Sequence, residues 1–237
     1  MNFDYPTNHS TNGTLRAYMG YSTNFQAGYN AGFLSHCATS TGFLACGTTD
    51  FIRTGKRLAV GWDDRHNRTL VAWANQNRLT NADSRRVRIA VGVVDNTTLG
   101  PPFDAPVRSS VGPGVACKSG EAGGYDCILA YVDDGDTVSD VAIRRFSNYA
   151  TTTGYAATWD PTPRSLSISS FNALTAWFHN AYFYVGLVTA SGQIRVYRSL
   201  DGATWSLFTY FSGQSSVVGP SSVSYFTANN QIGWFSE

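Results

Sequence analysis

The chain has 237 residues, of which 43% are hydrophobic and 14% aromatic; this is enough apolar material for one well-buried core, or at most two small ones, and argues against a disordered chain. Only 14% of the residues are charged, whereas 23 Gly, 13 Tyr, 14 Phe and 6 Trp favour strands and tight turns over a helical bundle. The formal net charge is +1 without a basic block, which argues against nucleic acid as a partner, and no apolar run approaches the roughly 20 residues of a membrane span.

Short strand-like runs follow one another along the chain. In chain order they are 14–21, 57–62, 69–74, 87–90, 127–132, 143–146, 174–178, 182–187, 194–197 and 231–235. The stretch from Tyr29 to Phe51 does not fit this series, and it is either a long insertion or a degenerate extra unit.

An Arg that follows an apolar residue recurs in four of these runs. The four positions are Arg16, Arg88, Arg144 and Arg195, spaced 72, 56 and 51 residues apart. Around them each unit reads as strand, short turn, strand, polar turn, Arg-bearing strand, loop and a weaker fourth strand. Four antiparallel strands in about 50 residues are typical of a propeller blade. We expect the recurring arginines to form ion pairs or stacking contacts between blades.

The sequence therefore predicts an all-β fold, a small β-propeller of four or five four-stranded blades in a single domain that spans residues 1–237. The last unit stops after its second strand at Phe235, and the N-terminal run from Thr14 to Tyr21 resembles a third strand. We expect the N-terminal strands to complete the C-terminal sheet and so to close the ring without an exposed edge. The alternative is a β-sandwich.

Four cysteines lie in two close pairs, Cys37 with Cys46 and Cys117 with Cys127. Three connectivities are possible, and two local bridges, each closing an antiparallel hairpin, are the simplest. Disulfides indicate an oxidising compartment, so a secreted or extracellular location is expected. The first residues carry no secretory signal, which leaves a mature secreted chain, or a cytosolic protein with free thiols, as the two interpretations.

A seven-residue turn, Ser199-Leu200-Asp201-Gly202-Ala203-Thr204-Trp205, follows one of the Arg-bearing strands. It resembles the Asp-box (bacterial neuraminidase repeat) motif of sialidase-like propellers, Ser-x-Asp-x-Gly-x-Thr-Trp, in a shortened form. The resemblance implies a turn between the third and fourth strands of a blade, on the face opposite the active site of that family. Ser199, Asp201, Gly202, Thr204 and Trp205 are therefore expected to be structural.

The resemblance does not extend to sialidase activity. The other units lack the Ser, Gly or Trp of the motif, the chain has no Arg-Ile-Pro, and the family's rings have six blades where this chain supports four or five.

Loops between blades, and loops that join second to third strands, are expected to face a ligand. Their candidate ligand-binding residues are Arg78, Asp83, Arg85, Arg108, Asp133, Asp134, Asp136, Trp159 and Asp160. Aromatic faces that pack on sugar rings, with Asp and Arg bound to hydroxyls, would give lectin-like chemistry. For Trp159 a place in the blade core is the alternative.

Metal and cofactor signals are weak. The four histidines are scattered, with no pair at zinc spacing, so no metal or other cofactor is expected. The acidic run from Asp133 to Asp140 offers carboxylates to Ca²⁺, although a solvated hairpin tip explains it equally well. A second polar run, Trp62 to Asn67, lies in a first-to-second strand turn and is expected to be structural.

These observations predict an extracellular carbohydrate- or protein-binding propeller module without catalysis, whose partner is a glycan or an extracellular protein. The alternative is a glycoside hydrolase or lyase that uses Asp carboxylates at the channel mouth, where two carboxyls would stand about 5 to 9.5 Å apart. A purely structural or adhesive domain would show neither feature.

Overall fold

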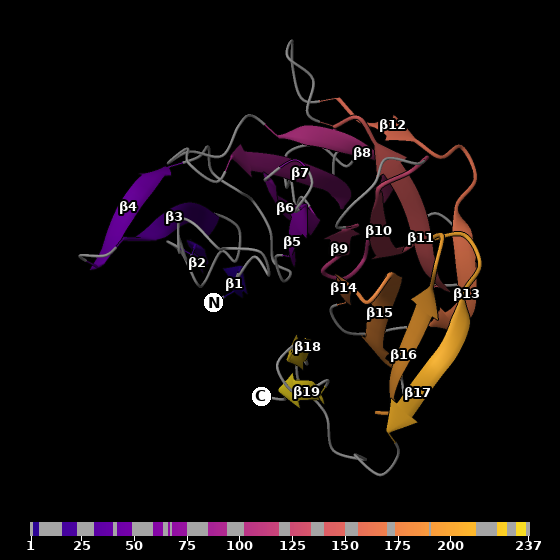
Figure 1. Cartoon of the computed structure of the whole chain (residues 1–237). Coiled ribbons are helices and arrows are strands. Elements are labelled where there is room, and N and C mark those ends of the chain that lie inside the picture. The colour runs from indigo at the N-terminus through magenta and orange to yellow at the C-terminus, as the bar shows by residue number, and fades with distance from the viewer. Residues whose placement is uncertain are drawn as a thin grey trace.

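Every regular element in the described part of the chain is a β-strand, and all the strand pairs are antiparallel (Figure 1). The computed structural model describes residues 2–4, 16–22, 31–39, 42–48, 59–63, 66, 68–74, 85–93, 102–118, 124–133, 140–149, 156–169, 174–189, 191–211, 222–226 and 231–235. For the first four and the last two of these ranges it describes the strands but not their side chains.

Three sheets are described in detail. The first contains β5 (Ala59–Asp63), β6 (Arg68–Ala74), β7 (Arg86–Val93) and β8 (Phe103–Arg108), in that order. The second contains β9 (Gly114–Cys117), β10 (Cys127–Val132) and β11 (Asp140–Ser147), followed by β12 (Thr158–Trp159) and β13 (Arg164–Ser169), which both pair with β11. The third contains β14 (Thr175–His179), β15 (Tyr182–Val188), β16 (Ile194–Ser199) and β17 (Ser206–Phe211).

Strand β10 explains how these three sheets stack. All six of its residues are buried, and they alternate between two hydrophobic clusters. Cys127, Leu129 and Tyr131 pack with residues of the β5–β8 sheet, whereas Ile128 and Ala130 pack with residues of the β14–β17 sheet. Because side chains alternate between the faces of a strand, the β9–β13 sheet lies between its two neighbours and both of its faces are core.

The first strands of successive sheets contact one another: β1 with β5, β5 with β9, β9 with β14, and β14 with β18. Two glycines allow this close approach. A Cβ on Gly61 would lie 2.7 Å from the backbone oxygen of Val115, and a Cβ on Gly114 would lie 3.0 Å from the backbone nitrogen of Ala176. Figure 1 shows these first strands on the inner side of the molecule and β8, β13 and β17 on its outer side.

The two ends of the chain form separate sheets. Strands β1 (Asn2–Asp4), β2 (Arg16–Ser22), β3 (Ala31–Thr39) and β4 (Gly42–Thr48) make one, and β18 (Ser222–Phe226) and β19 (Gln231–Phe235) make another. The predicted sheet shared by the two ends is thus wrong. The stretch from Tyr29 to Phe51, for which an insertion and a degenerate extra unit were both left open, supplies β3 and β4. These strands continue the hydrogen-bond ladder of β2, so that β2 is a second strand and not a third.

Candidate functional site

Three of the predicted ligand residues lie around the connection between β8 and β9. Arg85 immediately precedes β7, Arg108 ends β8, and Asp133 directly follows β10. The buried Ser109 fixes this arrangement, because its backbone N–H donates to the Arg85 carbonyl at 2.8 Å and its Oγ accepts from the Val132 N–H at 3.2 Å. One end of two neighbouring sheets therefore brings the main chain of these three residues together, and after the prediction made for them we call it the ligand end.

Hydrogen bonds within the connection make the ligand end a fixed feature. Ser109 Oγ donates to the Val111 carbonyl at 2.8 Å, and the Ser110 N–H donates to the Val132 carbonyl at 3.2 Å. The Asp133 N–H donates to the Asp140 carbonyl at 3.1 Å and closes the base of the β10–β11 hairpin. Backbone groups that are paired in this way fix the path of the main chain at the ligand end.

Asp133 also acts on a buried phenol below the ligand end. Burial and, to a smaller extent, the Asp133 charge raise the pKa of Tyr131 to about 12, against the opposing effect of Arg144. Tyr131 therefore remains a neutral phenol at physiological pH and does not serve as a base.

Four of the nine predicted ligand residues, Arg78, Asp83, Asp134 and Asp136, lie outside the described residues. The same holds for the central part of the acidic run, so the calcium site stays a prediction.

The remaining two of the nine predicted ligand residues, Trp159 and Asp160, lie away from the ligand end. Trp159 is opposite Phe146 near the end of β11, whereas Asp133 is beside the start of that strand. The ring centroids of Trp159 and Phe146 are 4.8 Å apart, and Trp159 packs against the hydrophobic cluster between the β5–β8 and β9–β13 sheets. Trp159 is thus a partly buried residue packed against the core, an arrangement close to the alternative that the sequence left open.

Asp160 is buried and bound by arginine. Its Oδ2 accepts from Arg145 Nε at 2.8 Å and from Arg145 Nη2 at 2.6 Å, and its Oδ1 accepts from the Thr162 N–H at 3.0 Å. Burial alone would raise the pKa of Asp160, but the Thr162 and Arg145 donors outweigh it and hold that pKa below its usual range. Asp160 is therefore an anion at neutral pH and links β11 to the segment between β12 and β13.

The recurring arginines make some of the contacts that the sequence predicted for them, ion pairs or stacking between blades. Arg144 donates to the carbonyl of Asp160 in its own sheet at 2.8 Å and to that of Pro106 in the neighbouring sheet at 3.3 Å. Arg88 pairs within its sheet, with Asp104 Oδ1 at 2.9 Å, and Arg195 donates to Gln193 Oε1 at 2.6 Å. Among the described residues, Arg144 is the one of these three that donates hydrogen bonds to two sheets.

The turn between β16 and β17 is closed by its own side chains. Asp201 Oδ1 accepts from the N–H groups of Ala203 and Thr204, each at 2.8 Å, and Ser199 Oγ accepts from the Gly202 N–H at 2.8 Å. Gly202 has a φ of 72°, and Trp205 Nε1 donates to the Gly202 carbonyl at 3.0 Å. Asp201 accordingly closes a turn, and membership of the Asp-box family stays a prediction.

This turn also joins two sheets. Arg145 Nη1 donates to the Asp201 carbonyl at 3.3 Å, and a Cβ on Gly202 would meet Ile128 and Arg145 at 3.0 and 3.2 Å. Partial burial raises the pKa of Asp201, but the N–H donors of Thr204 and Ala203 outweigh it, so the pKa lies below its usual range. The turn therefore serves packing between the β9–β13 and β14–β17 sheets.

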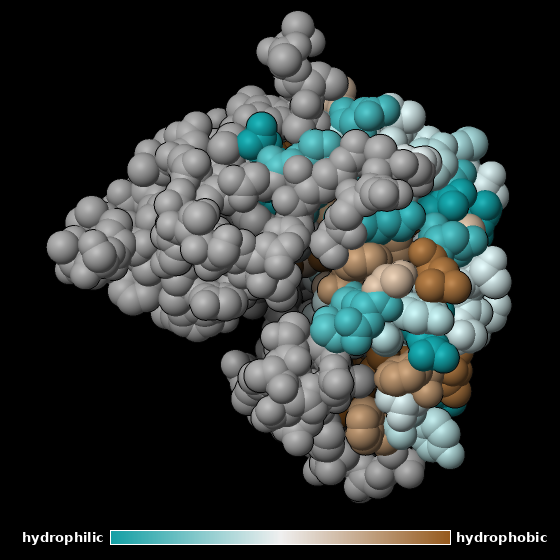
Figure 2. Space-filling model, in the orientation of Figure 1, coloured by the Kyte–Doolittle hydropathy of each residue, from teal (hydrophilic) through white to brown (hydrophobic). Residues whose placement is uncertain are grey.

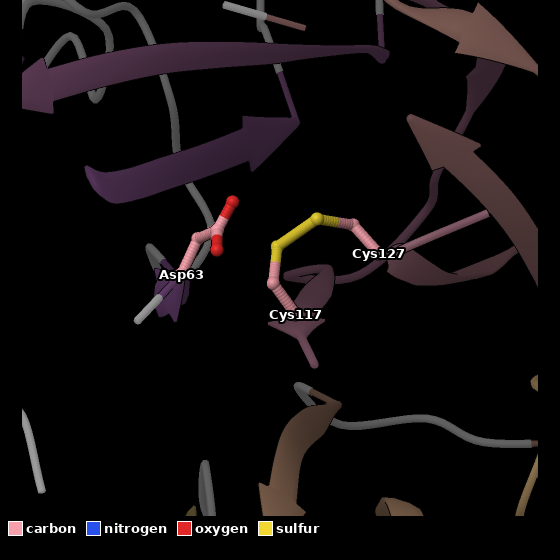
Figure 3. Close-up of side chains that lie close together, drawn as sticks. All are labelled: Asp63, Cys117 and Cys127. Carbon is pink, nitrogen blue, oxygen red and sulfur yellow. A yellow bond between two sulfur atoms is a disulfide. The ribbon is translucent and has the colours of Figure 1, made fainter. Parts of the chain in front are cut away.

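A buried polar cluster lies at the end of the sheets opposite the ligand end (Figure 3). Asp63 is beside Cys117 and Cys127, with one carboxylate oxygen and the two sulfur atoms within 4.8 Å of one another. The sulfurs are bonded to each other as a disulfide, so they are not thiolate ligands. His66 Nδ1 lies 2.6 Å from Asp63 Oδ2, and the buried Tyr149 hydroxyl donates to the same oxygen. The cluster therefore does not fit a metal.

One of the two predicted disulfides, Cys117–Cys127, is confirmed and links β9 to β10. Cys37 lies on β3 and Cys46 on the paired strand β4, but their side chains are outside the described residues.

The sequence analysis missed an aromatic surface on the β14–β17 sheet. Trp177 and Tyr184 stack in parallel with ring centroids 5.2 Å apart, and the Arg198 guanidinium lies 4.7 Å from the Phe208 ring centroid. Phe208 and Tyr210 on β17 are 43% and 55% exposed. Figure 2 shows apolar patches over this region. The high density of aromatic residues in 177–184, five of eight, was the available signal.

Solved structures of carbohydrate-active proteins resemble this fold. A sialidase of Trypanosoma rangeli in complex with sialic acid matches 93% of this chain and 41% of its own, with a TM-score of 0.53 and 14% identity. The SapL1 lectin in complex with alpha methyl fucoside matches 94% of this chain and 68% of its own, with a TM-score of 0.50 and 12% identity. This chain thus spans about two-fifths of the sialidase.

At these identities the likeness concerns the fold, which is all-β and propeller-like. No family model and no curated protein matches the sequence. Among the described residues no helix is long and apolar enough to cross a membrane.

Proposed function

We propose that the chain is an extracellular carbohydrate-binding propeller module that acts without catalysis. The observation that carries this proposal is the ligand end, where Ser109 holds Arg85, Arg108 and Asp133 at one end of two sheets. Guanidinium and carboxylate groups are suited to the hydroxyls of sugars. The structural likeness to a sialidase with bound sialic acid and to a lectin with bound methyl fucoside supports a glycan as the ligand.

The architecture that we propose for the module is a propeller of five blades. The candidate blades are the sheets β1–β4, β5–β8, β9–β13, β14–β17 and β18–β19. The contacts between successive first strands support this arrangement, because such strands line the axis of a propeller.

Four of the described carboxylates are engaged by groups of the fold, and this engagement favours binding over hydrolysis at their positions. Asp63 is bound to His66 and Tyr149, Asp104 to two arginines, Asp160 to Arg145, and Asp201 to backbone N–H groups. A glycosidase needs two carboxyls that face a common sugar. The second candidate function, a hydrolase or lyase, would therefore have to use other acids at the channel mouth.

The disulfide supports a secreted location. Cys117 and Cys127 are both buried and bonded, an arrangement that persists in oxidising compartments.

A glycan array combined with a panel of glycosidase and lyase assays tests the proposal. We expect binding to a defined set of glycans, no turnover of those glycans, and loss of binding in Arg108→Gln. The matched control is Arg164→Gln, on β13 of the neighbouring sheet, which should bind as the unchanged protein does. Turnover would replace the proposal with the hydrolase, and the absence of any glycan binding would leave a protein ligand or a structural role.

A further inference from the structure

The third and fourth strands of the β5–β8 sheet have an unusual arrangement of charge. The register of β7 and β8 sets Arg86 directly opposite Arg108, and Arg88 opposite Asp104. Like charges directly opposite in an antiparallel pair are destabilising. In the described strands β9 to β17 the register sets no Arg opposite another Arg.

Positive charge exceeds negative charge around these strands. At the ligand end Asp133 supplies one carboxylate, and residues 85–93 and 103–108 contain four arginines and the single carboxylate of Asp104. That carboxylate already accepts from Arg88 Nε at 2.9 Å and from Arg86 Nη1 at 3.4 Å. Because the whole chain carries a net charge of only +1, the excess is local to this edge.

Arg85 adds a strained backbone to this edge. Its φ is 67°, in the left-handed region that favours glycine, and its carbonyl is held there by the Ser109 N–H at 2.8 Å. A long side chain kept in such a conformation on an exposed loop points to a use for that side chain. Arg85 adjoins Arg86, so the strained residue lies beside the opposed pair.

We infer that the ligand end binds acidic glycans, through a carboxylate or sulfate group held by Arg85, Arg86 and Arg108. This inference rests on the proposed function and narrows its ligand class. An anion between Arg86 and Arg108 would remove their mutual repulsion. The planar guanidinium presents paired N–H donors that match the oxygens of a carboxylate or a sulfate.

The test uses an array of matched glycans that are neutral, contain uronic acid, are sialylated or are sulfated, read at low and high salt. We expect acidic glycans to bind and neutral ones to bind weakly, with affinity that falls as salt rises. Arg86→Gln and Arg108→Gln should each weaken acidic-glycan binding by about tenfold or more. Arg195→Gln, on the third strand of the β14–β17 sheet, is the control and should bind normally. Comparison of the uronic-acid and sialylated glycans with the sulfated ones shows whether the bound group is a carboxylate or a sulfate.

A further variant distinguishes a binding role from a role in folding. Arg85→Gly should raise the melting temperature, since glycine adopts the backbone without strain, and should weaken acidic-glycan binding. If the array shows only neutral glycans bound, or if the arginine variants bind acidic glycans normally, the inference is overturned while the proposed function stands. Equal binding of a polyaspartate peptide or of DNA would also overturn it, and if no glycan of any class binds, both proposals fail.

Discussion

Ala181 shows how one residue limits stability. It occupies the two-residue turn between β14 and β15 with a φ of 68°, next to Asn180 at 46°. Positive φ at both central positions is the type I′ geometry, in which glycine is preferred at the second position. Ala181→Gly should therefore stabilise the protein by about 1 kcal/mol and raise the melting temperature by about 2–4 °C. Ala176→Gly, in the regular strand β14, is the control and should lower it.

Two buttressed carboxylates make stability depend on acid. The pKa values of Asp160 and Asp201 are lower in the folded chain than the roughly 3.9 of an unfolded Asp. Their stabilisation is therefore complete above the unfolded pKa and is lost as pH falls through the folded values. Asp160→Asn and Asp201→Asn should each reduce the loss of unfolding free energy between about pH 6 and pH 3, measured by urea denaturation.

Arg145→Gln provides a second line of evidence for Asp160. It removes the guanidinium that lowers the Asp160 pKa and should also flatten the acid dependence. An acid dependence that is identical in all three variants and the unchanged protein would contradict this assignment.

Some features of single residues could be predicted from the sequence and others could not, for a physical reason. The turn at Asp201 was predictable because its hydrogen bonds join a side chain to backbone groups two and three residues away. The position of Trp159 was not, because it depends on which residue of β11 it pairs with. The opposed pair of Arg86 and Arg108 was missed for the same reason, since only the register reveals it.

The approach of the first strands can be tested at the scale of the element. Gly61 on β5 faces the Val115 backbone of β9 so closely that an added methyl group would displace a strand. Gly61→Ala should therefore destabilise the protein by about 1–3 kcal/mol, measured as the urea midpoint. Gly124→Ala is the control: its φ is 75° but no atom lies within 4 Å of the added Cβ, so only the backbone strain of about 1 kcal/mol should appear. An equal effect of the two variants would contradict close contact of β5 with β9.

The β9–β10 hairpin is held by its disulfide. Cys117 and Cys127 are separated by 10 residues, and opening such a loop costs about 3 kcal/mol in the loop-entropy estimate. We expect the double variant Cys117→Ala/Cys127→Ala to melt at a lower temperature than the unchanged protein. Once heating exposes the bridge, dithiol reductant should lower the melting temperature of the unchanged protein more than that of the variant, because only the unchanged protein has the Cys117–Cys127 bond to lose. A variant as stable as the oxidised protein would contradict the role of the bridge.

At the level of elements, the sequence pattern predicted individual hairpins better than it predicted which other strands pair with them. The hairpins β5–β6 and β14–β15 follow from apolar runs joined by short polar turns. Strands β3 and β4 were not assigned to a blade because residues 29–51 interrupt the spacing of the arginine-bearing strands, although the pair Cys37 and Cys46 predicted a hairpin there. Pairing between segments distant in sequence depends on packing that no local pattern records.

At the scale of the whole molecule, the shared middle sheet should make unfolding cooperative. Core residues of the β9–β13 sheet belong to the clusters on both of its faces, so loss of one neighbour exposes residues that support the other. The sheet order was inaccessible to the sequence, because β9 and β10 are buried on both faces and give a continuous apolar signal with no preferred side.

Hydrogen exchange in the native state measures this cooperativity. Ile89→Val removes one buried methyl group from the β5–β8 sheet and should lower the free energy of opening by about 1 kcal/mol. If the three sheets unfold together, the amides of β15, on the far side of the middle sheet, should lose the same amount as those of β7. The amides of β10 should exchange most slowly in the described strands, and those of the exposed outer strand β17 faster. A change confined to β7 would mean that the β5–β8 sheet opens by itself, and that the packing on the two faces of the middle sheet is energetically independent.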